Sequence, residues 1–149
     1  MKLKQKLNNS LLFSNYRIIN LILASILFAI FSYSAIYSPN KINHPIPSVF
    51  TQLTGEISPS TGLSRSFSSL IRCDVKSAIN FNPIGLQIFI FFLIQLVFRI
   101  GSFFLIKERF TLIKAYILSD ITLSTIGFLL VFSPLIKFTF ELFKKFIVN

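Results

Sequence analysis

The chain has 149 residues, of which 53% are hydrophobic and only 13% are charged, and its net charge is +10. An ordinary soluble domain carries about 25% charged residues, because ionised side chains keep its surface in water. The composition therefore excludes an ordinary soluble domain and indicates a single membrane domain with long apolar runs. One cysteine and one histidine exclude an internal disulfide and a thiolate zinc cluster, so we expect neither a metal site nor a cofactor.

The first apolar run, residues 18–37, is uncharged and predicts a transmembrane helix. About 20 residues at 1.5 Å per residue match a hydrocarbon core of about 30 Å. The basic residues before it also resemble the start of a secretory signal peptide. The run is longer than the usual apolar stretch of such peptides, about 7 to 15 residues. We therefore expect an uncleaved membrane anchor.

The connection that follows changes composition twice. Residues 38–60 are rich in Pro, Ser, Asn and Thr and predict a loop, because each proline removes a backbone donor. From about residue 61 to residue 80 the apolar positions recur every three or four residues, with Arg65, Ser69, Arg72 and Lys76 on the opposite side. This pattern predicts one amphipathic helix lying in the membrane surface. Asn82-Pro83 should end it.

Residues 84–106 and 113–136 predict the second and third spans, which makes the fold an all-α integral membrane protein with three transmembrane helices and one interfacial helix. Arg99 lies near one end of the second span, where we expect it to snorkel to the interface. The third span is the most polar. We expect it to pack against other helices through its small residues Ser119, Ser124, Gly127 and Ser133, because small side chains let backbones approach closely.

Basic residues give a slight orientation bias, with eight on the side of the N-terminus and seven on the other side. The short turn Lys107-Glu108-Arg109 is the kind of loop that the positive-inside rule weighs most. We therefore expect a multi-pass protein of the bacterial cytoplasmic membrane, with the N-terminus inside and the C-terminus outside. Because the positive charges flank apolar segments, we expect them to set topology or contact anionic lipid, and we expect no nucleic-acid partner.

Residues from about 48 to 86 contain a set of motifs with a recognisable order: Thr54-Gly55, Pro59, Gly62, Arg65, Asp74 and Asn82-Pro83. This order resembles the small bacterial membrane proteins of domain-of-unknown-function family 2752. Their signature runs Thr-Gly, two residues, Cys-Pro-x-Cys-Gly-x-Thr-Arg, then Gly-Asp, and finally Asn-Pro at the start of a transmembrane helix. The resemblance implies two turns, an arginine on the surface helix and a break into the membrane, but no settled activity.

The chain departs from that signature at its cysteines. Ser58 and Thr61 stand where the family has its two central cysteines, and Ser48 corresponds to a further upstream cysteine. Ser64 replaces the threonine before the arginine, and Cys73 replaces the glycine before Asp74. Any metal or disulfide role of the family's cysteines is therefore not expected in this chain.

Two groups of residues are candidates for chemistry. Arg65, Arg72 and Lys76 have the donors to bind a lipid phosphate or an acidic partner, or they form only the solvated face of an interfacial helix. Asp120 is the acidic residue inside an apolar run, which points either to a proton relay or ion site or to a structural pair. Since no other span offers a second carboxylate, we favour a structural pair formed locally, for which Lys114 lies about two turns away.

These observations favour a small non-catalytic integral membrane subunit that assembles, stabilises or anchors a larger bacterial membrane complex. Its partners would be other integral membrane proteins together with membrane lipids. No nucleophile motif or acid–base set supports an enzyme. The alternative is a lipid- or small-solute-handling membrane protein that acts through Arg65 and Asp120.

Overall fold

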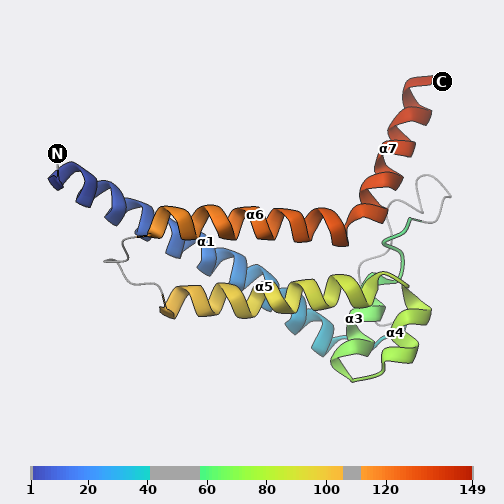
Figure 1. The fold of residues 1–149 in the computed structure, drawn as a ribbon. Coiled ribbons are helices and arrows are strands. Elements are labelled where there is room, and N and C mark those ends of the chain that lie inside the picture. Colours follow the sequence, from blue (N-terminus) through green and yellow to red (C-terminus); the bar gives the residue numbers. More distant parts are fainter. Residues whose placement is uncertain (1, 41–57, 106–111, 149) are drawn as a thin grey trace.

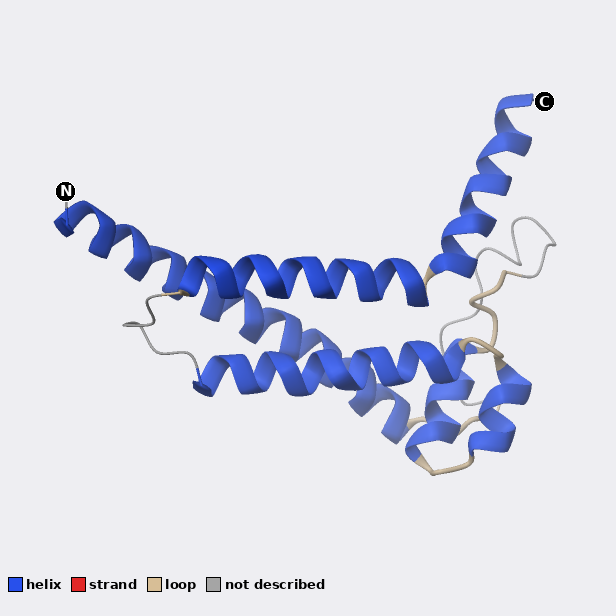
Figure 2. Ribbon diagram, in the orientation of Figure 1, coloured by secondary structure: helices blue, strands red, loops and turns tan. Residues whose placement is uncertain are grey.

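The computed structural model describes residues 2–40, 58–105 and 112–148, and all regular structure in these residues is helical (Figure 2). The helices are α1 (Lys2–Ile36), α3 (Leu63–Ile71), α4 (Val75–Phe81), α5 (Gly85–Leu105), α6 (Ile113–Val131) and α7 (Ser133–Val148). The long helices α1, α5 and α6 pack against one another, and α3 and α4 form a cap at one end of this bundle (Figure 1). The expected all-α fold is confirmed.

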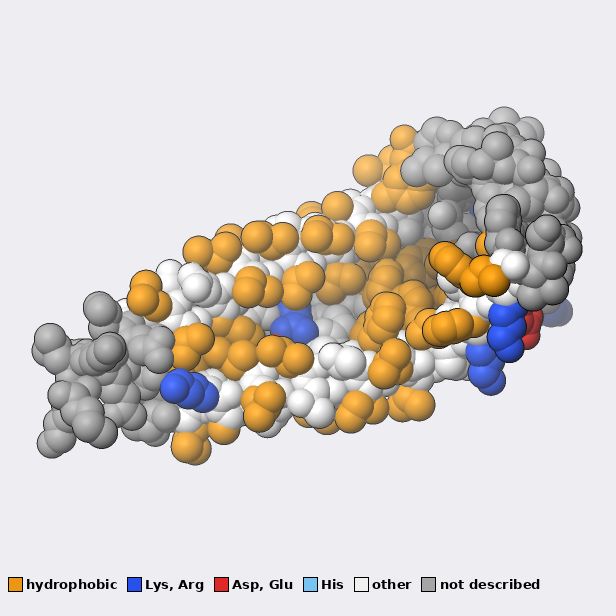
Figure 3. Space-filling view, turned by 90° about the horizontal axis from the view of Figure 1, so that it is seen from above, with side chains coloured by type: hydrophobic (Ala, Val, Ile, Leu, Met, Phe, Trp, Pro, Cys, Tyr) orange, Lys and Arg blue, Asp and Glu red, His pale blue; other side chains and the backbone are white. Residues whose placement is uncertain are grey.

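Three of these helices are long and apolar enough to cross a membrane: Ser10–Ile36, Gly85–Phe104 and Ile113–Val131. Large hydrophobic side chains are exposed along all three. On the face drawn in Figure 3, hydrophobic side chains extend along the bundle, while Lys, Arg, Asp and Glu gather mostly at the end with α3 and α4. An apolar belt with charged ends is the surface that a lipid bilayer requires. The chain is a multi-pass membrane protein.

Helix α1 is longer than the predicted span, because it begins at Lys2 rather than at residue 18. Lys, Leu and Gln are good helix formers, so a helix already established in the apolar segment extends through the basic leader. Helix α1 ends at Ile36, one residue before the predicted end of the first span. Inside the span, Ser25 and Ser34 donate hydrogen bonds to the carbonyls of Leu21 and Ile30, so each hydroxyl has a partner within its own helix.

The third span is shorter than predicted. Helix α6 ends at Val131, and Figure 1 shows α7 turning away from the bundle at this point. Pro134 has no backbone N–H and so cannot bond the carbonyl of Leu130. The Ser133 hydroxyl donates to that carbonyl instead, at 3.0 Å. The chain therefore bends at Phe132, between α6 and α7, and Ser133 stabilises this elbow.

The predicted interfacial helix is divided in two. Helix α3 ends in a Schellman motif, in which Cys73 N–H bonds the carbonyl of Leu70 and Asp74 N–H bonds that of Ser69, each at 3.0 Å. The motif requires a left-handed residue, and Cys73 has φ 61°. Asp74 then caps α4 by accepting from the N–H of Ser77 at 3.0 Å. The apolar period alone did not reveal this break, because a cysteine occupies the position where glycine is usual.

Phe67 attaches the cap to the spans. It is 3% exposed and lies against Phe31 of α1 and against Phe89 and Phe92 of α5, with ring centroids 5.3 to 6.5 Å apart. Phe67 thus packs against the first two spans. Ser69, which the helical pattern placed on the solvated side, is instead 1% exposed. The reason is that α3 contacts α1, α4 and α5, so more than one of its sides is covered.

The left-handed backbone at Cys73 generates a testable prediction. A side chain with a Cβ costs about 1 to 2 kcal/mol in this conformation, and glycine avoids that cost at a smaller entropic one. Cys73→Gly should therefore raise the free energy of unfolding by up to about 1 kcal/mol, measured by thermal unfolding in detergent. Cys73→Ala keeps the Cβ and should bring no gain. An equal gain from both variants would contradict this account.

Candidate functional site

Six polar side chains from all three spans meet inside the bundle, and we name them the intramembrane cluster: Tyr16, Asn20, Gln95, Arg99, Asp120 and Ser124. Each span contributes one pair spaced four residues apart. Residues with this spacing lie one above the other on the same helix face. Each pair therefore points at the other two helices, and the cluster joins segments far apart in the sequence.

The carboxylate of Asp120 accepts bonds from all three helices. It forms an ion pair with the Arg99 guanidinium, while the Tyr16 hydroxyl donates to the same carboxylate oxygen at 2.7 Å. The Ser124 hydroxyl donates to the second oxygen at 3.1 Å. Asp120 is 4% exposed and Arg99 is 7% exposed. Both charges are thus removed from the lipid surface and neutralise each other.

Both terminal nitrogens of Arg99 make further hydrogen bonds within the cluster. Its Nη1 donates to the Asn20 side-chain oxygen at 3.0 Å. Its Nη2 donates to the Gln95 side-chain oxygen at 3.0 Å and to the Ser124 hydroxyl at 2.9 Å. A buried ion pair is tolerated only when further hydrogen bonds satisfy both partners. The cluster supplies those bonds, so its arrangement suits holding three helices in register.

Two predictions about this region are wrong. Arg99 does not snorkel to the interface, because its guanidinium turns into the bundle toward Asp120. Asp120 pairs with Arg99 of α5 and not with Lys114, which is exposed on α6. Asp120 does form a structural pair, as expected, but its partner is Arg99 on the neighbouring helix. The proton-relay interpretation loses support, since Arg99 neutralises the Asp120 carboxylate and both carboxylate oxygens already accept hydrogen bonds from the chain.

Sequence reasoning did not identify Tyr16, Asn20 or Gln95. A signal was present, because each span contains a pair of large polar or charged side chains, or one with serine, at four-residue spacing, namely 16/20, 95/99 and 120/124. One such pair is weak evidence. Three of them, with opposite charges in two, are the pattern of a polar contact between membrane helices.

The arginines of the cap bind backbone carbonyls. Arg72 donates to the carbonyls of Ser34 and Ala35, at 3.2 and 2.9 Å, and to that of Ser68 at 2.8 Å. The first two belong to the last turn of α1, where carbonyls lack helical partners and a cation is favourable. Arg65 donates to the carbonyl of Pro39 at 2.8 Å. Arg65 and Arg72 thus cover the end of the first span.

Other residues of the signature close the same cap. Asn82 is 1% exposed, donates to the carbonyls of Pro59 and Thr61 at 2.8 and 2.9 Å, and accepts from the N–H of Ile84 at 3.0 Å. It therefore connects the turn at residues 58–62 to the start of α5. Gly62 has φ 80°, and a Cβ there would lie 2.3 Å from the carbonyl oxygen of Phe81. No other residue fits that turn.

The other signature residues and Lys76 lie at the surface of the cap or outside the described residues. Arg65 stacks its guanidinium carbon 4.0 Å from the ring centroid of Phe81. Hydrogen bonds from the side chain and the backbone N–H of Ser77 hold the pKa of Asp74 below its usual value. Pro83 and Lys76 are exposed. Thr54 and Gly55 lie outside the described residues.

Ser58 and Thr61, which replace the signature cysteines, belong to one turn. The N–H of Thr61 bonds the carbonyl of Ser58 at 2.9 Å, and the hydroxyls of Ser58 and Ser60 lie 2.9 Å apart. Thr61 also supplies one of the two carbonyls that Asn82 binds. Hydrogen bonds therefore hold this turn.

The small residues of the third span have different surroundings. Ser124 belongs to the intramembrane cluster, and a Cβ on Gly127 would lie 3.0 Å from the ring of Phe91 on α5. Ser133 supports the elbow. Ser119 is exposed. Of the four, Ser119 is therefore the residue that faces outward, and enlarging Gly127 would first disturb the packing of α5 on α6.

The ion pair generates the second prediction. Arg99→Leu and Asp120→Leu should each lower the free energy of unfolding by about 3 to 5 kcal/mol, because each leaves one buried charge without its partner. The double variant should lose markedly less than the two single losses together. Thermal unfolding in detergent measures all three. Lys114→Leu is the control and should leave stability unchanged. A loss equal to that of Arg99→Leu would instead support the local pair with Lys114.

Comparison with known proteins gives one match, to a sequence family. No curated protein and no solved structure matches the chain. The sequence model of a family described as "Protein of unknown function (DUF2752)" matches residues 48–96. The matched segment includes the turn, α3, α4 and the first half of α5. The predicted resemblance to this family is therefore confirmed over residues 48–96, about a third of the chain.

Proposed function

We propose that this chain is a small non-catalytic subunit of a bacterial membrane complex, which it assembles, stabilises or anchors. The observation that carries the proposal is that the arginines of the cap and the buried ion pair all bind other groups of the same chain. Arg99 and Asp120 neutralise each other inside the bundle, and Arg65 and Arg72 bind backbone carbonyls of the cap. These groups maintain the fold of the chain itself.

The exposed surface supports the same proposal. Large apolar side chains remain exposed on every span, for example Phe28, Phe104 and Leu123 at 65, 74 and 70%. Lipid accepts such a surface, and so does another membrane helix. The alternative, handling of a lipid or small solute through Arg65 and Asp120, has less support because both side chains already have partners within the chain.

Ser119 is the position from which we test partner binding. It is exposed on α6, and small residues on a span allow close helix contact. Ser119→Leu should reduce recovery of the partner several-fold when the tagged full chain is purified from its native host in mild detergent. Insertion should not change, because leucine is acceptable to lipid. The ratio of partner to chain is measured by quantitative mass spectrometry.

The matched control is Ser25→Leu on α1, which is also exposed and lies away from the intramembrane cluster. It should keep the wild-type ratio. Recovery of the wild-type chain alone, without a membrane protein at fixed stoichiometry, would contradict the subunit proposal. Equal losses for both variants would contradict the assignment of the third span as the contact.

We also propose that the N-terminus lies in the cytoplasm and the C-terminus outside it, in the bacterial inner membrane. The support is the excess of basic residues beside short connections on the N-terminal side. The test uses intact cells that express the chain with Cys73 replaced by serine. An impermeant thiol reagent should label Asn43→Cys in this background and leave Glu108→Cys unlabelled. Labelling of the Glu108 position would reverse the orientation.

A further inference from the structure

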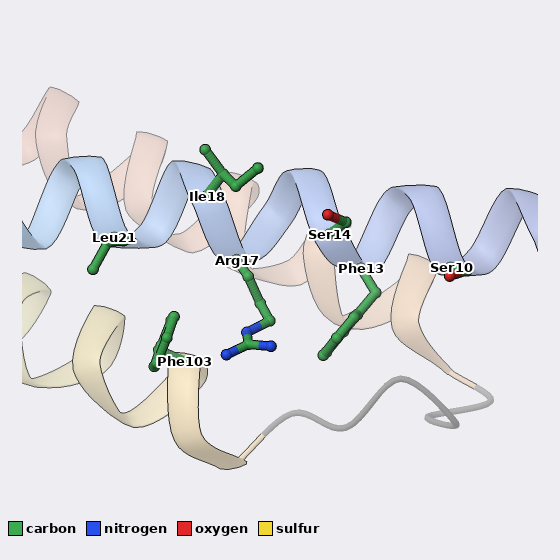
Figure 4. Close-up of a pocket in the computed structure, with 7 residues that line it drawn as sticks. All are labelled: Ser10, Phe13, Ser14, Arg17, Ile18, Leu21 and Phe103. Atoms are coloured by element: carbon green, nitrogen blue, oxygen red, sulfur yellow. The ribbon is translucent and has the colours of Figure 1, made fainter.

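A pocket of about 350 Å³ opens between the N-terminal part of α1 and the end of α5. Figure 4 shows the Arg17 side chain extending from α1 between the rings of Phe13 and Phe103. The lining residues are Ser10, Phe13, Ser14, Arg17, Ile18, Leu21 and Phe103. The pocket therefore combines one cation with two hydroxyl-bearing side chains and apolar walls.

Aromatic contacts hold the Arg17 guanidinium in place. Its central carbon lies 4.4 Å from the ring centroid of Phe103 and 5.4 Å from that of Phe13. These contacts use the flat face of the guanidinium and leave its N–H donors available. Within the described part of the chain, the buried Nε of Arg17 has no hydrogen-bond partner. Arg65, Arg72 and Arg99, by contrast, all donate to oxygens of the chain.

The sequence that precedes and contains Arg17 favours an anion. Residues 1–40 contain no Asp or Glu, and Lys2, Lys4 and Lys6 precede the start of the span at Ser10. Clustered basic residues beside a transmembrane helix attract anionic lipid. Arg17 lies seven positions beyond Ser10, which is about 10 Å along the helix. An arginine side chain bridges much of that distance toward the headgroups.

We propose that this pocket binds the phosphate of an anionic phospholipid. The guanidinium donates paired hydrogen bonds to the phosphate oxygens, a geometry that arginine supplies and lysine does not. The acyl chains lie along Ile18 and Leu21, both 54% exposed beside the pocket. These apolar neighbours favour a lipid over hydrated inorganic phosphate. The site is separate from the intramembrane cluster and independent of the proposed subunit role.

The full chain, purified in neutral detergent, tests the proposal by native mass spectrometry and thermal unfolding. Phosphatidylglycerol should be retained and should raise the Tm more than phosphatidylcholine with the same acyl chains. Arg17→Gln should weaken phosphatidylglycerol binding roughly tenfold or more, because a charge-assisted contact is lost. Arg17→Lys should recover part of the loss. Lys137→Gln removes one exposed charge on α7 and should have no effect.

Three outcomes would overturn the proposal: equal retention of the two lipids, equal effects of Arg17→Gln and Lys137→Gln, or the same stabilisation by millimolar inorganic phosphate alone. If Arg17→Gln fails to fold, Ser14→Leu decides the question. Ser14 is exposed on the lining of the pocket, so a leucine fills the space while remaining acceptable to lipid. Loss of phosphatidylglycerol selectivity in Ser14→Leu supports the site, and full retention refutes it.

Discussion

The arrangement of the three spans depends on the ion pair between Arg99 and Asp120. Neither charge is tolerated against lipid by itself, because hydrocarbon offers no compensating bonds. Pairing them requires α5 and α6 to meet at one register, and the hydroxyl of Tyr16 and the amide of Asn20 bring α1 to the same point. Apolar packing alone would specify this register less well, because lipid tails are as apolar as the side chains and can replace them.

A second constraint acts at the end of the bundle, where the chain leaves the membrane and enters it again. Carbonyls at the end of α1 and in the turn at residues 58–62 need donors. Arg72 and Asn82 supply them. Gly62 permits the close approach of that turn to α4. The residues shared with the DUF2752 signature are therefore explained by backbone hydrogen bonding and chain reversal.

The same explanation applies to the two positions where the family signature described above has cysteines. Ser58 and Thr61 stand at positions in a turn that is held by its own backbone bond and by Asn82. The cap thus keeps its shape when hydroxyl residues replace thiols there. At Cys73, by contrast, this chain has a cysteine in a left-handed backbone position that suits glycine.

The four described arginines have two kinds of surroundings. Arg65, Arg72 and Arg99 donate to oxygens of the chain, whereas Arg17 faces a pocket.

Sequence alone determined the number of spans, the all-helical class and the family resemblance, because apolar run length and the order of short motifs are local properties. It also indicated that Asp120 is structural. Tertiary structure decided the partner of Asp120, the burial of Arg99 and the roles of Arg65, Arg72 and Asn82, since each depends on which helices lie side by side. The division of the interfacial helix at Cys73 and the elbow after Val131 also required the structure. In both places the apolar pattern continues, while backbone hydrogen bonding, which that pattern does not encode, ends the helix.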